Sequence, residues 1–301
     1  MANAVAKGAL RRAQKAKDDE FYTRIEDVER ELAFYPGAFT GKRVYCPCDG
    51  PESAFVQFFR DHFDELGLER LTWSSLGGSC GMLTRNGLVE WPIPDGRFQS
   101  ADSTSLLAEC DVVVTNPPFS LFREFFDWLT ASGKGFIVLC NQNAITYKNV
   151  FPRILAGEAW LGANQGEMKF RVPADSEPRV NRYWVDETGQ KWRSLGNGCW
   201  LTNIDHTRRH ETIPLTATYD PAKYPRYDNY DAINVDRVKD IPNDYEGVMG
   251  VPITFLGKWN PRQFGLVGFR KGDDGEDLSY LQGRRLVTPY FRVLVRRCYS
   301  D

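Results

Sequence analysis

The stretch DVVVTNPPFSLF, Asp111–Phe122, places three consecutive valines and a threonine directly before an asparagine and two prolines. Its apolar run is continuous rather than alternating, as expected of a strand in a parallel sheet that is covered on both faces. Pro117 and Pro118 cannot donate ladder hydrogen bonds, so the strand must stop at Asn116. The stretch therefore predicts a buried strand with an abrupt polar end.

A helix and another strand follow the two prolines. Ser120 is the predicted N-cap of this helix, which ends near Gly133. The apolar face of the helix consists of Phe122, Phe125, Phe126 and Leu129. Residues 135–140, GFIVLC, form the next predicted strand. Such a crossover implies a parallel strand pair with its loop at the carboxyl ends, where open α/β sheets bind ligands.

A similar unit precedes this stretch in the chain. We expect a strand at residues 41–46, a proline-containing loop, and a helix whose apolar face runs from Phe55 to Leu66 and stops at Gly67. Leu68–Trp73 predicts a second strand, and residues 77–96 read as a glycine-rich connection. The pattern predicts an α/β fold built on a doubly wound, mostly parallel sheet.

Helical periodicity fades beyond about Trp160. Short β-like runs broken by Gly, Pro and Asn replace it: MKFRVP, CWLTNI, VPITFL, FGLVGF and FRVLVRR. We see no internal repeat and no low-complexity linker. We expect one domain over residues 1–210, carrying the cofactor site and the catalytic residues, and a β-rich target-recognition region over residues 211–301.

Composition limits the function classes. The chain has 301 residues, 42% hydrophobic side chains and a formal net charge of -2, which describes an ordinary globular protein. A nucleic-acid partner would have to meet a local basic surface, because the overall charge offers no attraction. No apolar run reaches the ~20 residues of a membrane span, and the N-terminus lacks the apolar core of a signal peptide. We expect no membrane partner and a cytoplasmic location.

Other features carry weaker signals. The basic first twenty residues read as a solvated helix or as an arm that contacts phosphates. Seven cysteines are odd in number and never spaced as CxxC, which favours reduced structural thiols. His206 and His210 lie four residues apart without an HExxH or CxxC motif, so no metal site is predicted.

The turn after the valines suits a specific chemistry. The side-chain carbonyl of Asn116 and the backbone carbonyl of Pro117 are two convergent acceptors for a planar amino group. Phe119 offers a flat face on which an aromatic ring can stack. Accepting both N–H bonds would activate the nitrogen of an exposed aminopurine as a nucleophile. The structural alternative is a turn that merely terminates the strand.

NPPF in this setting resembles the Asn-Pro-Pro-aromatic motif of amino-group methyltransferases that use S-adenosylmethionine. The wider chain is similar to the EcoRI-type adenine-specific DNA methyltransferase family, in family order from near residue 18 to near residue 268. The matching segments are DDEFYT, VYCPCDGPESAFVQFF, VVVTNPPFSLFREFF, NQNAITYKNVF, WLTNIDHTRRHE, YPRYDNYDAINV and IPNDYEGVMGVPITFLGKWNPRQF.

The resemblance implies a class I, Rossmann-like methyltransferase fold and a set of site residues. Those that would hold and activate a flipped adenine are Asn116, Pro117, Pro118 and Phe119. Those that would bind S-adenosylmethionine are Phe21, Tyr22, Thr23, Cys46, Cys48, Asp49, Ser53, Asp95, Phe98 and Asn116. The alternative for Asp49 is an Asx-turn that stabilises its loop.

One segment departs from the family pattern. Where the family has Gly-Asp-Phe-Arg-Ser ahead of the catalytic strand, this chain has GRFQS at residues 96–100. The acidic residue that would face the adenine of the cofactor is therefore replaced by Arg97. Either Asp95 substitutes for it or the contact is absent, which puts cofactor affinity in question.

Extruding a base from duplex DNA costs a few kcal/mol that phosphate and groove contacts must supply. Arg208, Arg209 and His210 are the predicted DNA-binding residues, and Arg284-Arg285 and Arg296-Arg297 are further basic clusters. Solvated surface is the alternative for each cluster. The expected partner is double-stranded DNA, the chain is expected to be a monomer, and a cognate restriction endonuclease as functional partner is left open.

We therefore interpret the chain as a site-specific DNA adenine methyltransferase of restriction-modification, or of protection from restriction. Two alternatives remain. A methyltransferase of protein glutamine side chains uses the same kind of loop and predicts no affinity for duplex DNA. A degenerate DNA-binding protein that has lost its cofactor would bind DNA but not S-adenosylmethionine.

Overall fold

A computed structural model describes residues 21–178, 180–270 and 277–298. The chain divides into two compact units, one of residues 1–150 and 164–204, the other of residues 151–163 and 205–301. The prediction for the first twenty residues lies outside the described part. Over the described ranges, no helix combines the length and hydropathy needed to cross a membrane.

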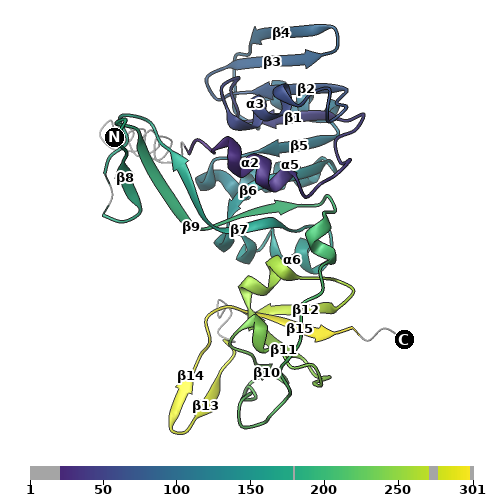
Figure 1. The fold of residues 1–301 in the computed structure, drawn as a ribbon, viewed down its shortest axis with the longest axis vertical. Helices are drawn as coiled ribbons and strands as arrows, with labels where there is room; N and C mark the ends of the chain where they lie inside the picture. The colour runs from purple at the N-terminus through teal and green to yellow at the C-terminus, as the bar shows by residue number, and fades with distance from the viewer. Residues whose placement is uncertain (1–20, 179, 271–276, 299–301) are drawn as a thin grey trace, which may run out of the picture. The chain divides into compact units, whose positions relative to one another are not determined.

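The first unit is built on a nine-stranded sheet in the order β4-β3-β2-β1-β5-β6-β9-β7, with β8 paired to β9 (Figure 1). β2, β1, β5 and β6 run parallel, whereas β3, β4 and β9 join antiparallel. The strands are β1 Arg43–Pro47, β2 Arg70–Ser74, β3 Ser79–Thr84, β4 Gly87–Pro92, β5 Val112–Thr115, β6 Gly135–Asn141, β7 Trp160–Arg171, β8 Tyr183–Val185 and β9 Lys191–Thr202.

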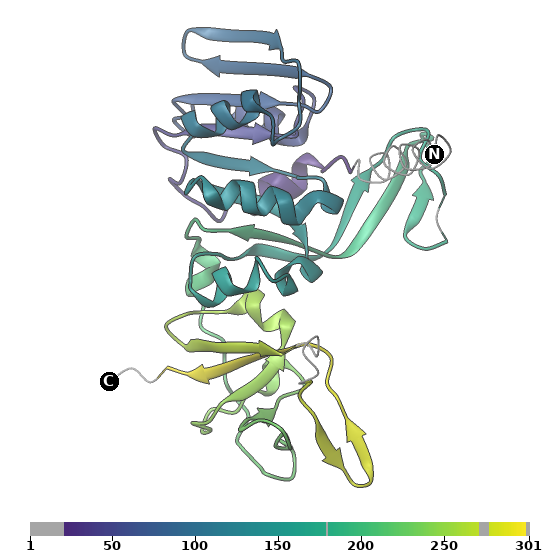
Figure 2. The ribbon, with the colours of Figure 1, turned by 180° about the vertical axis from the view of Figure 1, so that it is seen from behind.

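Helices lie on both faces of this sheet, as the front and back views show (Figures 1 and 2). They are α2 Ile25–Leu32, α3 Ala54–Asp61, α4 Ala101–Glu109 and α5 Phe122–Ala131. The phenylalanines of α3 and the valine and leucine of α2 share one core cluster with Val44 and Val112. On the opposite face, Phe126 of α5 packs edge-on against Phe136 of β6, with ring centroids 5.8 Å apart. The predicted doubly wound, mostly parallel α/β fold is confirmed.

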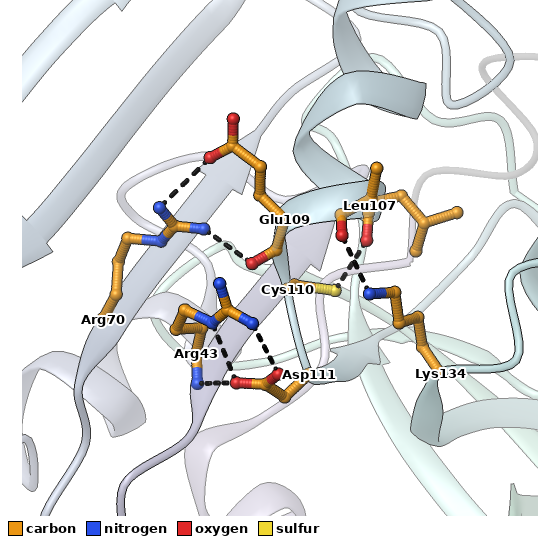
Figure 3. Close-up of polar contacts among 8 residues, drawn as sticks. Arg43, Arg70, Leu107, Glu109, Cys110, Asp111 and Lys134 are labelled. Atoms are coloured by element: carbon orange, nitrogen blue, oxygen red, sulfur yellow. Dashed lines mark hydrogen bonds and ion pairs between the residues drawn. The ribbon is translucent and has the colours of Figure 1, made fainter.

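Ion pairs fasten the amino ends of the central strands (Figure 3). The guanidinium of Arg43 on β1 donates to both carboxylate oxygens of Asp111, at 3.0 and 2.8 Å, and lowers the pKa of that carboxyl to about 2. Arg70 on β2 likewise donates to the carboxylate and carbonyl of Glu109. These contacts hold β1, β2 and β5 together at the edge opposite their carboxyl ends.

The second unit contains a four-stranded sheet in the order β10-β11-β15-β12 and a separate hairpin of β13 and β14. Its strands are β10 Ile233–Asn234, β11 Met249–Pro252, β12 Phe264–Arg270, β13 Tyr280–Gln282, β14 Arg285–Val287 and β15 Arg292–Arg297. The α-helix α6, Phe151–Leu155, and several 3-10 turns accompany them. The predicted β-rich character of the C-terminal region is confirmed. Its role in target recognition stays a prediction.

The structure corrects several predicted elements. Residues 77–96 are not a simple connection but hold the β3–β4 hairpin, which extends the sheet antiparallel. The sequence hides β4 because nearly all of that strand is exposed and lacks an apolar alternation. The helix α4, capped by Ser100, was missed because its apolar face is narrow.

Three predicted boundaries are also wrong. Helix α3 ends at Asp61 rather than at Gly67, since His62 leaves helical geometry and its ring stacks on Phe58. Ser120 is not the N-cap of α5, because a 3-10 turn, η1 Phe119–Leu121, comes first and Leu121 takes that position. The strand expected at VPITFL stops at Pro252 and continues as a 3-10 turn.

All seven cysteines are free thiols, as predicted. The sulfur atoms of Cys140 and Cys199 face each other across β6 and β9 at 3.3 Å, a hydrogen-bonding distance rather than a covalent one. In the described residues, no group of three or more histidines, cysteines and acids could hold a metal ion.

Candidate active site

The order of the parallel strands places a ligand crevice beside Asn116. From β1 the chain adds β2 on one side and later β5 on the other, so the direction of winding reverses between β1 and β5. Open α/β sheets bind ligands outside the carboxyl ends of strands at such a switch point. The loops that leave these two ends are residues 48–53 and residues 116–121. The first belongs to the predicted cofactor segment, residues 46–53, whose first two residues end β1, and the second is the predicted catalytic loop.

Thr115, the last residue of β5, joins the two loops. Its buried hydroxyl lies within hydrogen-bond distance of the Pro47 carbonyl oxygen and of Oδ2 of Asp49, the latter at 2.6 Å. Asp49 itself is 6% exposed. Burial raises the pKa of its carboxyl to about 7, although hydrogen bonds from Thr115 and Ser53 act to lower it. The predicted cofactor residue is thus an acid poised between its two protonation states.

The other predicted residues of the cofactor loop stabilise the structure around them. Ser53 caps α3 by accepting a hydrogen bond from the Val56 amide at 3.2 Å. The Cys46 side chain belongs to the hydrophobic core, so its thiol is not available to a ligand. Cys48 adopts a left-handed backbone with φ 67°, and burial raises the pKa of its thiol well above the usual range. Both thiols are therefore neutral.

Asn116 presents an acceptor that nothing in the described chain satisfies. Its Nδ2 donates to the Phe21 carbonyl oxygen at 2.8 Å, which fixes the orientation of the amide. Its Oδ1 is buried and has no hydrogen-bond partner among the described residues. Buried polar atoms are nearly always paired in folded proteins, so this acceptor at the carboxyl end of β5 is available to a hydrogen-bond donor of a ligand. Sequence reasoning required this carbonyl to be free.

The predicted N-terminal motif lies against the same turn. The Tyr22 amide and carbonyl form a two-way bridge with Arg171 of β7, at 2.9 and 3.1 Å, and Asn116 holds the preceding carbonyl. Tyr22 has 50% of its side chain exposed. Thr23 is buried, and its Oγ1 is a second polar atom without a partner in the described chain. Thr23 thus carries a second orphaned oxygen two residues from Phe21, whose carbonyl Asn116 holds.

An aromatic cluster borders the catalytic loop. The Phe119 ring lies 5.3 Å from that of Phe21 and 6.5 Å from that of Phe170, measured between centroids. The Arg193 guanidinium on β9 lies 4.8 Å above Phe21. Phe170 and Arg193 escaped sequence analysis, since β7 and β9 lie far along the chain and carry no motif. The only available signal was the alternation of apolar residues in MKFRVP.

Comparisons with known proteins show to which family the chain is similar. The model of a family described as adenine-specific methyltransferase EcoRI matches residues 9–85 and 91–297. The Type II methyltransferase M.EcoRI of Escherichia coli is 44% identical over 324 aligned residues that cover 98% of each chain. The Type II methyltransferase M.MpnI of Mycoplasma pneumoniae is 40% identical over 85% of this chain and 84% of that relative.

This chain belongs to the EcoRI methyltransferase family. A further relative is the Type II methyltransferase M.MgeORF184P of Mycoplasma genitalium, 35% identical over 85% of the chain. No solved structure gives a significant match. The predicted family is confirmed, whereas the roles of the individual site residues stay predictions.

The segment that departs from the EcoRI methyltransferase pattern, residues 95–98, contains an ion pair and a buried phenylalanine. Arg97 donates to both carboxylate oxygens of Asp95 and lowers the pKa of that acid to about 2. Arg97 is exposed and Asp95 is half-buried, so the pair borders solvent. Phe98 packs in the core against Phe125 and Trp128, with centroids 5.2 and 5.5 Å away. A cofactor that accepts a contact from Asp95 would therefore meet a carboxylate whose two oxygens already accept hydrogen bonds from Arg97.

The basic cluster at residues 208–210 is occupied by contacts within the second unit. The Arg209 guanidinium stacks 3.8 Å above the Trp160 ring and faces Trp259 at 5.4 Å. Arg208 donates to the Ala163 carbonyl at 2.8 Å, and His210 Nε2 lies 2.7 Å from an Asp205 carboxylate oxygen. His206 is buried beside the Leu161 carbonyl, and burial lowers its pKa. Their assignment to DNA stays a prediction.

Proposed function

We propose that the protein is a site-specific DNA methyltransferase that modifies the exocyclic amino group of adenine in duplex DNA. The observation that carries the proposal is the buried, unpartnered Oδ1 of Asn116 at the end of β5. Membership in the EcoRI methyltransferase family and the Type II methyltransferases among its relatives support it.

The residues at the switch point fit S-adenosylmethionine as the cofactor. Thr23 and Asn116 offer orphaned oxygens, and the Asp49 carboxyl can balance a cation. We propose that Phe21, Tyr22, Thr23 and the loop 48–53 hold it. The bound cofactor supplies an electrophilic methyl group on a positively charged sulfur.

The catalytic loop would orient and activate the amino group that receives the methyl group. An aromatic amine is a poor nucleophile because its lone pair is delocalised into the ring. The Asn116 and Pro117 carbonyls would accept its two N–H bonds, return electron density to nitrogen and aim its lone pair along one direction. Phe119 would stack on the flipped base, with Phe21 and Phe170 supporting its ring. The extra proton then leaves to solvent, so no residue needs to act as a covalent nucleophile.

The Type II methyltransferases among the relatives also support a restriction-modification setting. We propose that the chain acts as a monomer in the cytoplasm, in restriction-modification or in protection from restriction. The competing glutamine methyltransferase would share the loop but not the family. The degenerate DNA-binding protein would not be expected to retain both orphaned oxygens at an intact NPPF turn.

The direct test is methylation of duplex DNA by the purified chain, with the modified nucleoside identified by mass spectrometry. We expect N6-methyladenine in the wild type. Asn116→Ala removes the amide acceptor and should lower kcat by about 10²–10³-fold, while its melting temperature stays near that of the wild type.

Asn86→Ala, in the exposed turn of the β3–β4 hairpin, is the matched control and should retain full activity. A wild-type chain that methylates cytosine or a glutamine peptide would contradict the substrate. Full turnover by a folded Asn116→Ala protein would contradict the role of the acceptor.

A further inference from the structure

The Thr115 hydroxyl faces two acceptors with one hydrogen. It is fully buried and lies against the Pro47 carbonyl oxygen of β1 and Oδ2 of Asp49. A hydroxyl group has a single O–H donor and two acceptor lone pairs. Thr115 therefore cannot donate fully to both oxygens while the Asp49 carboxyl is ionised.

Protonation of Asp49 removes this conflict. A protonated Asp49 can donate its own O–H to Thr115 Oγ1, which leaves the Thr115 hydrogen free for the Pro47 carbonyl. All three oxygens are then paired. The 2.6 Å separation of Asp49 Oδ2 and Thr115 Oγ1 suits a hydrogen bond in either direction.

The surroundings of Asp49 favour the same neutral state. Its carboxyl is hydrogen-bonded to the hydroxyls of Thr115 and Ser53 and interacts electrostatically with the thiols of Cys46 and Cys48. Burial raises the pKa of both thiols, so they are neutral and stabilise no charge through attraction. Burial also raises the pKa of Asp49 to about 7, which leaves it largely protonated below neutral pH.

We propose that Thr115 and Asp49 together hold a proton in the ligand-free protein and release it to solvent when S-adenosylmethionine binds. This inference rests on the proposed function. The cofactor carries a net charge of +1, so its arrival stabilises the ionised carboxylate, and one proton leaves as one positive charge enters. The Thr115 hydrogen then turns to Asp49 and orients it. Thr115 is thus a positioning residue that couples the cofactor loop to Asn116, its neighbour.

Proton release can be measured without any methylation. S-adenosylmethionine is titrated calorimetrically into the full chain between pH 5.5 and 8.5, in buffers that differ in ionisation enthalpy. We expect the wild type to release about one proton per bound cofactor at pH 6 and half as much near pH 7. Asp49→Asn should release none at pH 6, because an amide has no proton to lose in this range.

Two variants at residue 115 isolate the hydroxyl. Thr115→Val removes a hydroxyl that accepts from the protonated acid and donates to the ionised carboxylate. The hydrogen bond to the charged form is the stronger one, so the pH of half-release should move upward by about one unit. Thr115→Ser keeps the donor and should restore the wild-type midpoint. The amino group of the cofactor titrates in every sample alike, so only differences between variants count.

The outcomes separate this inference from the proposed function. Binding without proton release in the wild type, or an unchanged midpoint in Thr115→Val, would overturn the inference and leave the methyltransferase assignment intact. A wild type that binds no S-adenosylmethionine at any pH would overturn both. If Thr115→Val fails to fold, release by Asp49→Asn equal to that of the wild type would still refute the inference.

Discussion

At the scale of single residues, the site is defined by polar atoms that the fold buries without pairing them. The Asn116 amide donates one hydrogen bond through its nitrogen, which fixes the orientation of the amide and leaves its oxygen available as an acceptor. Preorganised acceptors act strongly because they need no rearrangement during the reaction. The Thr115 hydroxyl is likewise held in place, within hydrogen-bond distance of the Asp49 carboxyl.

Asp49 should make the stability of the protein depend on pH. Its folded pKa of about 7 lies above the ordinary value of 3.8, so its contribution to stability is complete below pH 4 and is lost as pH rises through 7. Relative to Asp49→Asn, the wild type should lose up to roughly 4 kcal/mol of unfolding free energy between pH 4 and pH 8. Urea unfolding at several pH values measures this difference.

Asp61→Asn, at an exposed carboxylate on α3, controls for the loss of one negative charge. That variant should follow the wild type at every pH. Parallel pH profiles for wild type and Asp49→Asn would show that the buried carboxyl does not titrate in this range.

At the scale of elements, prolines and glycines set where strands end and how closely loops pack. The two prolines stop β5 at the switch point, and the 3-10 turn after them delays the start of α5. Gly96 has a different role, because its backbone lies against that of residue 75 beside the β3–β4 hairpin. A Cβ atom on Gly96 would fall 1.9 Å from the Ser75 carbonyl oxygen.

Gly96→Ala should therefore destabilise the first unit strongly. The clash involves backbone on both sides, so no side chain can swing away, and we expect a loss of roughly 2–4 kcal/mol. Gln99→Ala, at an exposed position three residues on, should change stability by less than about 0.5 kcal/mol. Thermal unfolding of both variants decides the matter; equal melting temperatures would show that the loop relaxes freely.

At the scale of the whole molecule, a net charge of -2 requires DNA to meet a local basic surface. The guanidinium of Arg209 is engaged by tryptophans, and its side chain is only 15% exposed. Arg284 and Arg285, by contrast, are exposed on the β13–β14 hairpin. These two are better placed than Arg209 to contact phosphates.

The double variant Arg284→Ala/Arg285→Ala should reduce the slope of log K against log salt for duplex DNA by about 2, since each phosphate contact contributes about 0.9. Arg209→Lys should leave the slope unchanged and lower the stability of the second unit by about 1–2 kcal/mol through the lost stacking. Fluorescence titrations at several salt concentrations measure the slope. A larger reduction of the salt slope by Arg209→Lys than by the double variant would assign the phosphate contacts to Arg209 instead.

Much of the first unit was readable from local pattern. β-branched runs, the paired prolines and the spacing of phenylalanines each act over a few residues, so β1, β5, α5 and β6 were predicted close to their observed bounds. The exposed strand β4 and the weakly amphipathic α4 carried no such pattern. Their places depend on neighbours that are distant in sequence.

By itself, the sequence determined the strand and the turn of the NPPF stretch, because backbone preferences are properties of consecutive residues, and it supplied the acceptors on which the proposed chemistry rests. Only the tertiary structure decided that the Asn116 amide is turned by Phe21, that Phe170 and Arg193 border the site, and that Thr115 reaches Asp49. The physical reason is that hydrogen-bond partners and burial arise from contacts between segments far apart in the chain. Those contacts exist only once the sheet has formed.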